Sequence, residues 1–169
     1  MLTHSTVGST TLDDSRVYLE GIIPGVIGAV TIAIWFLILD TIDSRPLYTP
    51  SVLGTVLFRR GSDLASLEKL PVSWEMTLMY TWVHTMLFAV IGGIVSKLLA
   101  LAEKNPELGF GILLLFIILD FGFIAAAFVF AEPILHALAW PAVLVGNLLA
   151  AAAMGCYFWH RHPDLVVRP

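Results

Sequence analysis

Four apolar runs, each long enough to cross a lipid bilayer, make up most of this chain. The hydrocarbon core of a bilayer is ~30 Å thick, so a helix that rises ~1.5 Å per residue needs ~20 apolar residues to cross it. Because no water reaches that depth, the backbone of each run must satisfy its own hydrogen bonds, as an α-helix does. The four runs are residues 21–40, 76–102, 109–131 and 134–159.

These runs predict an all-α fold, a four-helix transmembrane bundle. The composition agrees, because 58% of the residues are hydrophobic and 13% are charged, whereas soluble domains have about 25% charged residues. Residues 1–20 are rich in Ser, Thr, Gly and Asp and are expected to form a polar, flexible tail. Residues 21–160 are expected to form the four-span membrane domain, and residues 161–169 a C-terminal tail.

The connection between the first two spans, residues 41–73, predicts one or two short interfacial helices. Thr49 and Pro50 are typical of a helix start, with Thr49 as the N-cap and Pro50 at the first helical position. Apolar residues then recur at helical spacing, at Val52, Leu53, Val56 and Leu57. Ser62 begins a second candidate helix, which Pro71 ends. Both pieces are too short to span, so we expect them to lie in the membrane interface or to cover the bundle as a lid. The alternative is an ordinary loop whose leucines dock on neighbouring helices.

The topology follows from the even number of spans. We call the N-terminal side of the membrane side A and the opposite side side B; four spans return the C-terminus to side A. Lys and Arg are divided almost evenly between the two sides, so the positive-inside rule depends on details. The side B loop around Glu132 and Pro133 has no Lys or Arg, and Lys104 and Arg161 lie close to helix ends on side A. These details favour a plasma (inner) membrane protein with both termini in the cytoplasm.

Two further patterns agree with these spans. Indole rings favour the headgroup level, and tryptophans occur toward the predicted ends: Trp35, Trp74, Trp82 and Trp140 on side B, and Trp159 on side A. Small residues let helices approach closely in lipid, and they gather in three spans: Gly21, Gly25 and Gly28; Gly92, Gly93 and Ser96; Gly146, Ala150, Ala151 and Gly155. These faces would serve the internal bundle, a dimer contact or a larger partner.

Asp120, in the middle of the third run, is the main candidate for a binding site. A carboxylate at that depth costs roughly 2.5–3.5 kcal/mol on insertion scales unless it is protonated, paired or facing water. It would be either a proton or cation site, or a protonated side chain hydrogen-bonded to a neighbouring helix. His84, Asn147 and Thr31 lie at similar depth in the other spans, which predicts an intramembrane polar cluster.

A second group of charges, Asp40, Asp43 and Arg45, lies at the side B end of the first span. These three residues would form either a charged site or the ordinary polar boundary of a helix.

No cofactor or metal site is predicted. Haem is an alternative because His84 lies within a span, but its candidate mate, His136, lies close to the interface. Glu132 and His136 supply two ligands, whereas zinc needs three or four. Cys156, the single cysteine, is expected to be a small buried thiol of the fourth span.

The sequence has no basic stripe for nucleic acid, no Gly-rich phosphate loop and no nucleophile elbow. Its loops are short and its small-residue faces are plentiful. We therefore expect a non-catalytic accessory or scaffold subunit that packs in the lipid bilayer against a partner membrane protein or against itself. One alternative is a proton- or cation-coupled small transporter that uses Asp120. The other is a haem-binding electron-transfer subunit that uses His84.

Overall fold

The computed structural model describes residues 7–59, 71–105, 107, 110 and 140–161, and their side chains from residue 18 onward. This part of the chain forms four α-helices, α1 (Val7–Ile42), α2 (Tyr48–Phe58), α3 (Trp74–Lys104) and α6 (Trp140–Arg161), and no strand. Three segments are long and apolar enough to cross a membrane: Tyr18–Ile42, Trp74–Lys104 and Trp140–Arg161. The chain is therefore a helical, integral membrane protein.

The sequence predicted these three spans, with differences at their ends. Helix α1 begins at Val7, so the expected flexible tail of residues 1–20 is helical from that point. The predicted third span, residues 109–131, lies outside the described residues except for Phe110, as does the second candidate helix of the long connection.

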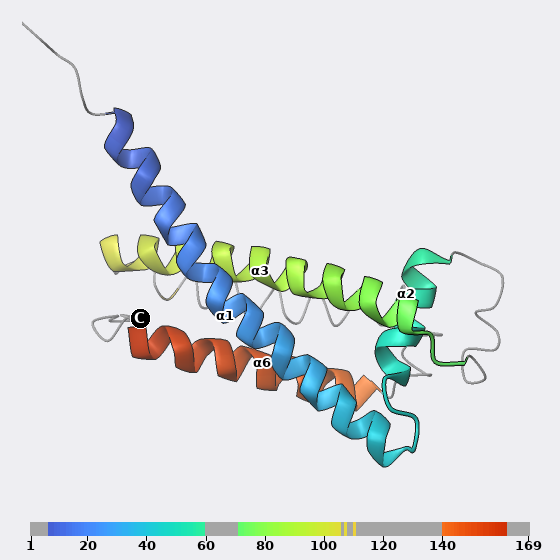
Figure 1. Cartoon of the computed structure of the whole chain (residues 1–169). Coiled ribbons are helices and arrows are strands. Elements are labelled where there is room, and N and C mark those ends of the chain that lie inside the picture. Colours follow the sequence, from blue (N-terminus) through green and yellow to red (C-terminus); the bar gives the residue numbers. More distant parts are fainter. Residues whose placement is uncertain (1–6, 60–70, 106, 108–109, 111–139, 162–169) are drawn as a thin grey trace, which may run out of the picture.

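Helix α1 is the element that joins the bundle. It lies across α3 and α6 and packs against both, while α2 lies across the side B end of α3 and packs on its first turns (Figure 1). The residues of α1 that meet α3 run in the opposite order along the two helices, from Tyr18 at Lys97 to Gly25 at Phe88. Helices α1 and α3 are therefore antiparallel.

Glycine makes the approach of α1 to α3 close. A Cβ atom on Gly21 would meet the backbone of Gly92 and Gly93, and one on Gly25 would meet the backbone of Phe88 and Ala89. Such contacts leave no room for a side chain on either helix, so the two backbones touch directly. In lipid, where burial of apolar surface gains little, this close van der Waals contact is a main source of helix association.

Helix α6 meets α1 through a second set of small residues. A Cβ atom on Gly28 of α1 would lie 2.7 Å from Met154 Sδ of α6, and one on Gly146 of α6 would lie 3.0 Å from the Trp35 ring of α1. The buried residues of α6 follow a spacing of four, at Gly146, Ala150, Met154 and Phe158. Most of the small residues predicted for the three spans therefore serve the internal bundle; Ala151 and Gly155, which are exposed, do not.

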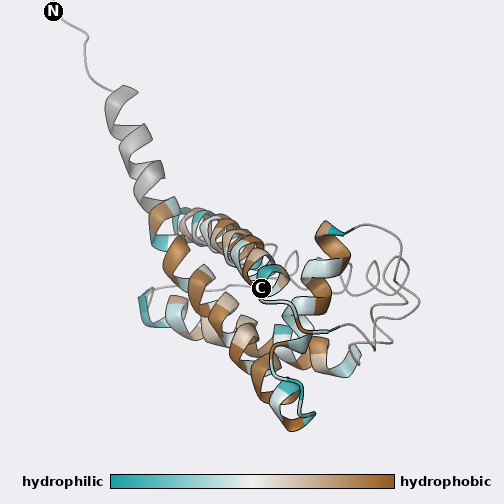
Figure 2. Ribbon diagram, turned by 45° about the vertical axis from the view of Figure 1, so that its right-hand side comes forward, coloured by the Kyte–Doolittle hydropathy of each residue, from teal (hydrophilic) through white to brown (hydrophobic). Residues whose placement is uncertain are grey.

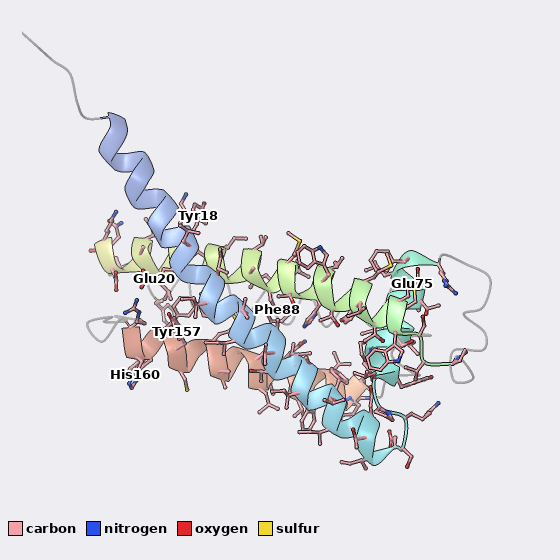
Figure 3. All side chains as sticks on the ribbon, in the orientation of Figure 1. Tyr18, Glu20, Glu75, Phe88, Tyr157 and His160 are labelled. Carbon is pink, nitrogen blue, oxygen red and sulfur yellow. The ribbon has the colours of Figure 1, made fainter. Side chains whose placement is uncertain are left out.

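Polar contacts near the helix ends show in which direction the helices run relative to one another. On side A, Lys97 of α3 donates a hydrogen bond to the Tyr18 hydroxyl at 3.0 Å, and Arg161 of α6 pairs with Glu20 of α1 at 3.3 Å (Figure 3). On side B, the indole N–H of Trp35 donates to the carbonyl of Ala142 at 2.9 Å. Helix α6 therefore runs antiparallel to α1 and parallel to α3. Trp35, expected at the headgroups, serves to join α1 to α6.

The outward faces of the three long helices are apolar (Figure 2). The large exposed side chains near the middle of these helices include Val26, Val30 and Ile34 of α1, Met86, Leu87 and Val90 of α3, and Leu148 and Leu149 of α6. Exposing such apolar faces to water would be unfavourable in free energy, whereas contact with lipid chains carries no such penalty. The exposed tryptophans Trp74, Trp82, Trp140 and Trp159 lie toward the helix ends, where the sequence predicts headgroup contact.

The glycine contacts make a matched test. Gly25→Ala should destabilise the folded bundle by about 1–3 kcal/mol, because the new methyl group overlaps the Phe88 backbone, which cannot rotate away. Gly155→Ala should leave stability unchanged or raise it slightly, since none of the residues that the structure describes comes within 4 Å of that position and alanine favours helix. Unfolding in mixed micelles, followed by circular dichroism, measures both variants. Equal losses would show that α1 and α3 are not in backbone contact.

Candidate functional site

Three of the four residues of the predicted intramembrane cluster fall within the described helices. Asp120 lies outside them. Thr31 of α1 donates its hydroxyl hydrogen bond to the carbonyl of Ile27, one turn earlier, at 2.8 Å, so its polar group is satisfied within its own helix. Asn147 of α6 is half-buried, and its side chain makes no hydrogen bond to another described residue. The described helices therefore do not join Thr31 and Asn147 to a shared site.

His84 of α3 is the member of the cluster with an unusual environment. Its imidazole is stacked between two rings of the same helix face, at 5.4 Å from Tyr80 and 4.7 Å from Phe88, centroid to centroid. The backbone of Ala29 on α1 lies beside it. Its Nε2 atom is buried and has no hydrogen-bond partner among the described residues. A buried polar atom left unpaired typically costs about 1–3 kcal/mol, so this nitrogen is the unsatisfied polar position of the α1–α3 contact.

The second candidate ligand for haem, His136, lies outside the described residues, as does Glu132 of the weak metal pair. Within the described helices, no group of three or more His, Cys, Asp or Glu side chains is placed to hold a metal ion.

A better-defined polar site lies on side B, where α1 meets α2. Asp40, 5% exposed near the end of α1, accepts two hydrogen bonds from Thr49. Its Oδ2 accepts from the Thr49 backbone N–H at 2.8 Å, and its Oδ1 accepts from the Thr49 hydroxyl at 2.7 Å. Thr49 lies in the first turn of α2, where backbone N–H groups lack partners and the helix dipole favours negative charge. Asp40 therefore caps α2 from the preceding helix.

This arrangement corrects the predicted start of α2. Helix α2 begins at Tyr48, and the N-cap position is held by Leu47, which has a φ of 66° and forms no side-chain capping hydrogen bond. The prediction that Thr49 is the N-cap is wrong, because its hydroxyl faces Asp40 and its backbone is already helical. Sequence reasoning missed the role of Asp40, since a carboxylate nine residues before its partner leaves no local pattern.

The turn that brings Asp40 to α2 is tight. Two non-glycine residues, Ser44 and Leu47, have positive φ angles of 60° and 66°, a conformation that costs roughly 1 kcal/mol or more per residue. The Arg45 backbone N–H donates to the Asp40 carbonyl at 2.8 Å, and the Arg45 guanidinium lies 4.1 Å above the Tyr48 ring. Asp43 is exposed. Of the three charged residues at this end of α1, only Asp40 is buried.

The other side of α2 is fixed to α3. The Ser51 hydroxyl accepts a hydrogen bond from the Ser73 backbone N–H at 2.8 Å, directly before α3 begins. A Cβ atom on Gly54 would meet the backbone of Met76, so α2 touches α3 as closely as α1 does. The Val52 side chain packs inward and is 1% exposed.

The polar groups described above mostly join one helix to the next. Asp40 and Thr49 join α1 to α2, Ser51 joins α2 to the start of α3, and Trp35 joins α1 to α6. Comparisons of the chain with protein-family models, curated proteins and solved structures yield no match.

The Asp40–Thr49 pair can be tested by a double-mutant cycle. Asp40→Ala and Thr49→Val should each destabilise the fold, and the double variant should lose less than their sum, with a coupling of about 1–3 kcal/mol, because hydrogen bonds to a charged group are lost only once. Unfolding in mixed micelles measures the three variants. Asp43→Ala is the matched control and should change stability by less than about 0.5 kcal/mol, since Asp43 is exposed. If the stability losses of the two single variants simply add in the double variant, Asp40 and Thr49 do not interact.

Proposed function

We propose that the chain is a non-catalytic accessory or scaffold subunit that packs against a partner protein within the membrane. The observation that carries the proposal is the outward face of α6. Its inward face, which includes Ala150 and Met154, packs against α1. On its outward face, small residues alternate with larger apolar ones, and all four residues of this row are exposed: Leu148, Ala152, Gly155 and Trp159.

The outward face of α6 differs from those of α1 and α3. Other glycines of the three long helices all lie in contact with a neighbouring helix, whereas no atom of the described residues lies within 4 Å of the side-chain position of Gly155. The glycines in contact are Gly21, Gly25, Gly28, Gly92, Gly93 and Gly146. A shallow region flanked by Leu148 and Trp159 lets another helix approach closely, which is how helices associate in lipid. Cys156, expected to be buried, is exposed beside it.

The proposal includes the fourth span. Helices α3 and α6 are parallel, so the chain must return from side A to side B between Lys104 and Trp140. Residues 109–131 form an apolar run of the length needed for that crossing, which supports a four-helix transmembrane bundle. The contact between Glu20 and Arg161 supports placing both termini on one side. The cytoplasm and the plasma membrane remain the proposed locations.

The partner contact can be tested with a matched pair of variants. Gly155→Leu fills the shallow region of α6 and should reduce co-purification of the partner from mildly solubilised membranes by about tenfold or more, which corresponds to a loss of about 1.4 kcal/mol. Ala33→Leu places the same side chain on an exposed position of α1 and should leave co-purification intact. Native gels and quantitative mass spectrometry measure both variants.

The same experiment separates a foreign partner from a second copy. If the partner is another copy of the chain, mild oxidation should link two Cys156 thiols into a covalent dimer, and Gly155→Leu should prevent it. If both variants retain every associated protein, the outward face of α6 is a lipid-facing surface and the accessory role loses its support.

A second candidate function is a proton- or cation-coupled transporter that uses Asp120. The observation that favours it is the buried, unpaired Nε2 of His84, which is free to exchange a proton with a group on another helix. Under this function, the Asp120→Asn and His84→Gln variants should fold normally but lose pH-dependent flux in proteoliposomes. The Thr31→Val variant should fold and keep that flux. Flux that survives Asp120→Asn would exclude it. A Soret band in the purified protein would instead favour haem ligation by His84.

A further inference from the structure

Helix α2 departs from the pattern expected for a helix in water, because its inward face combines an apolar cluster of Tyr48, Val52 and Val56 with buried polar side chains, while its last residues are apolar and exposed. A surface helix of a soluble protein turns its apolar residues inward and its polar residues outward. In α2, Thr49 and Ser51 are buried together with Val52, while Leu57 and Phe58 at its end are 50% and 38% exposed. The inward hydroxyl groups are all paired, with Asp40 and with the Ser73 backbone. Nothing polar of α2 needs water on its outer face.

The surroundings of this outer face continue the lipid-facing surface of the bundle. The end of α2 meets the start of α3 at the Arg59–Glu75 ion pair, whose side chains lie 3.6 Å apart and are 63% and 68% exposed. Next to the two partners in sequence stand Phe58 on one side and Trp74, 68% exposed, on the other. Exposed tryptophan and arginine beside exposed apolar side chains are typical of the headgroup level of a bilayer.

The direction of α2 agrees with this placement. Figure 1 shows α2 lying across the side B end of α3 rather than along it. A helix that crosses the end of a transmembrane helix in this way lies close to the membrane plane. In Figure 2 the ribbon of α2 alternates between hydrophobic turns and paler, more polar ones. It is held in place from one side by Asp40 of α1 and from the other by Ser73 and the backbone of Met76.

We propose that the outer face of α2 is a lipid-binding surface: Leu57 and Phe58 insert into the side B leaflet just below the headgroups, and Arg59 lies at the level of the lipid phosphates. The bilayer, rather than a protein, covers this face. Helix α2 is then a fixed interfacial helix and not a lid that opens to water. The inference is independent of the proposed partner contact on α6.

Spin labels on the full-length chain test the proposal. In a Cys156→Ser background, single cysteines at Leu57, Phe58, Arg59, Val30 and Asp43 carry a nitroxide in liposomes of phosphatidylcholine and phosphatidylglycerol. Collision with oxygen reports the acyl region, and collision with a water-soluble nickel chelate reports water. Labels at Leu57 and Phe58 should favour oxygen, as at the lipid-facing Val30, while Arg59 should be intermediate and Asp43 should favour nickel.

Two outcomes overturn the proposal. Nickel-favoured labels at Leu57 and Phe58, as at Asp43, would place the outer face of α2 in water. Labels that neither reagent reaches would mean that protein covers the face. Because a label could disturb α2, the unmodified chain is also treated in liposomes with a lipid-soluble carbene-generating probe. Peptides of residues 48–58 should be labelled about as strongly as those of the outward face of α1, and absence of labelling would contradict lipid contact.

Discussion

The backbone contact between α1 and α3 is the interaction on which the rest of the structure depends. Gly21 and Gly25 of α1 lie directly against Gly92 and Phe88 of α3, at a separation that any side chain would widen. This contact sets the direction of α1, which then reaches α6 through Gly28 and Trp35. It also brings Tyr18 to Lys97 on side A. A displacement of α1 would therefore break its polar contacts with α3 and α6 on side A and its hydrogen bond with α6 on side B at the same time.

The close glycine contacts do not determine which helix ends pair or in what register. Polar side chains do so. In lipid an unpaired polar group is costly, so a pair formed between two helices has few competitors. Asp40 shows this most clearly: its carboxylate is buried, and both oxygens are used by Thr49 of the next helix. The turn between them has two positive φ angles, at Ser44 and Leu47, an unfavourable conformation that the contacts around the turn must offset.

The sequence predicted what depends on composition and spacing, and missed what depends on distant partners. Apolar length identified three of the helices described by the structure, and small residues marked the faces by which α1 and α3 meet, although not that these two helices are partners. Both signals are local. The start of α2 was misplaced at Thr49, since the residue that caps it, Asp40, belongs to the preceding helix. The hydrogen bond from Trp35 to the carbonyl of Ala142 was not predicted, because the two residues are far apart in sequence. Of the predicted polar cluster, His84 has a distinctive environment and Thr31 is satisfied locally.

The outward surfaces of the bundle differ in what they gain from protein contact. The faces of α1 and α3 carry large aliphatic side chains, among them Val30 and Val90, for which lipid chains and a protein surface are nearly equivalent neighbours. Helix α6 is different because, in the region around the exposed Gly155, no described atom lies within 4 Å of the position of a Cβ atom. Flexible lipid chains fill such a region with loss of entropy, whereas a helix fills it once and gains continuous van der Waals contact. Shape, more than hydrophobicity, therefore distinguishes α6 as the surface that a second protein would recognise.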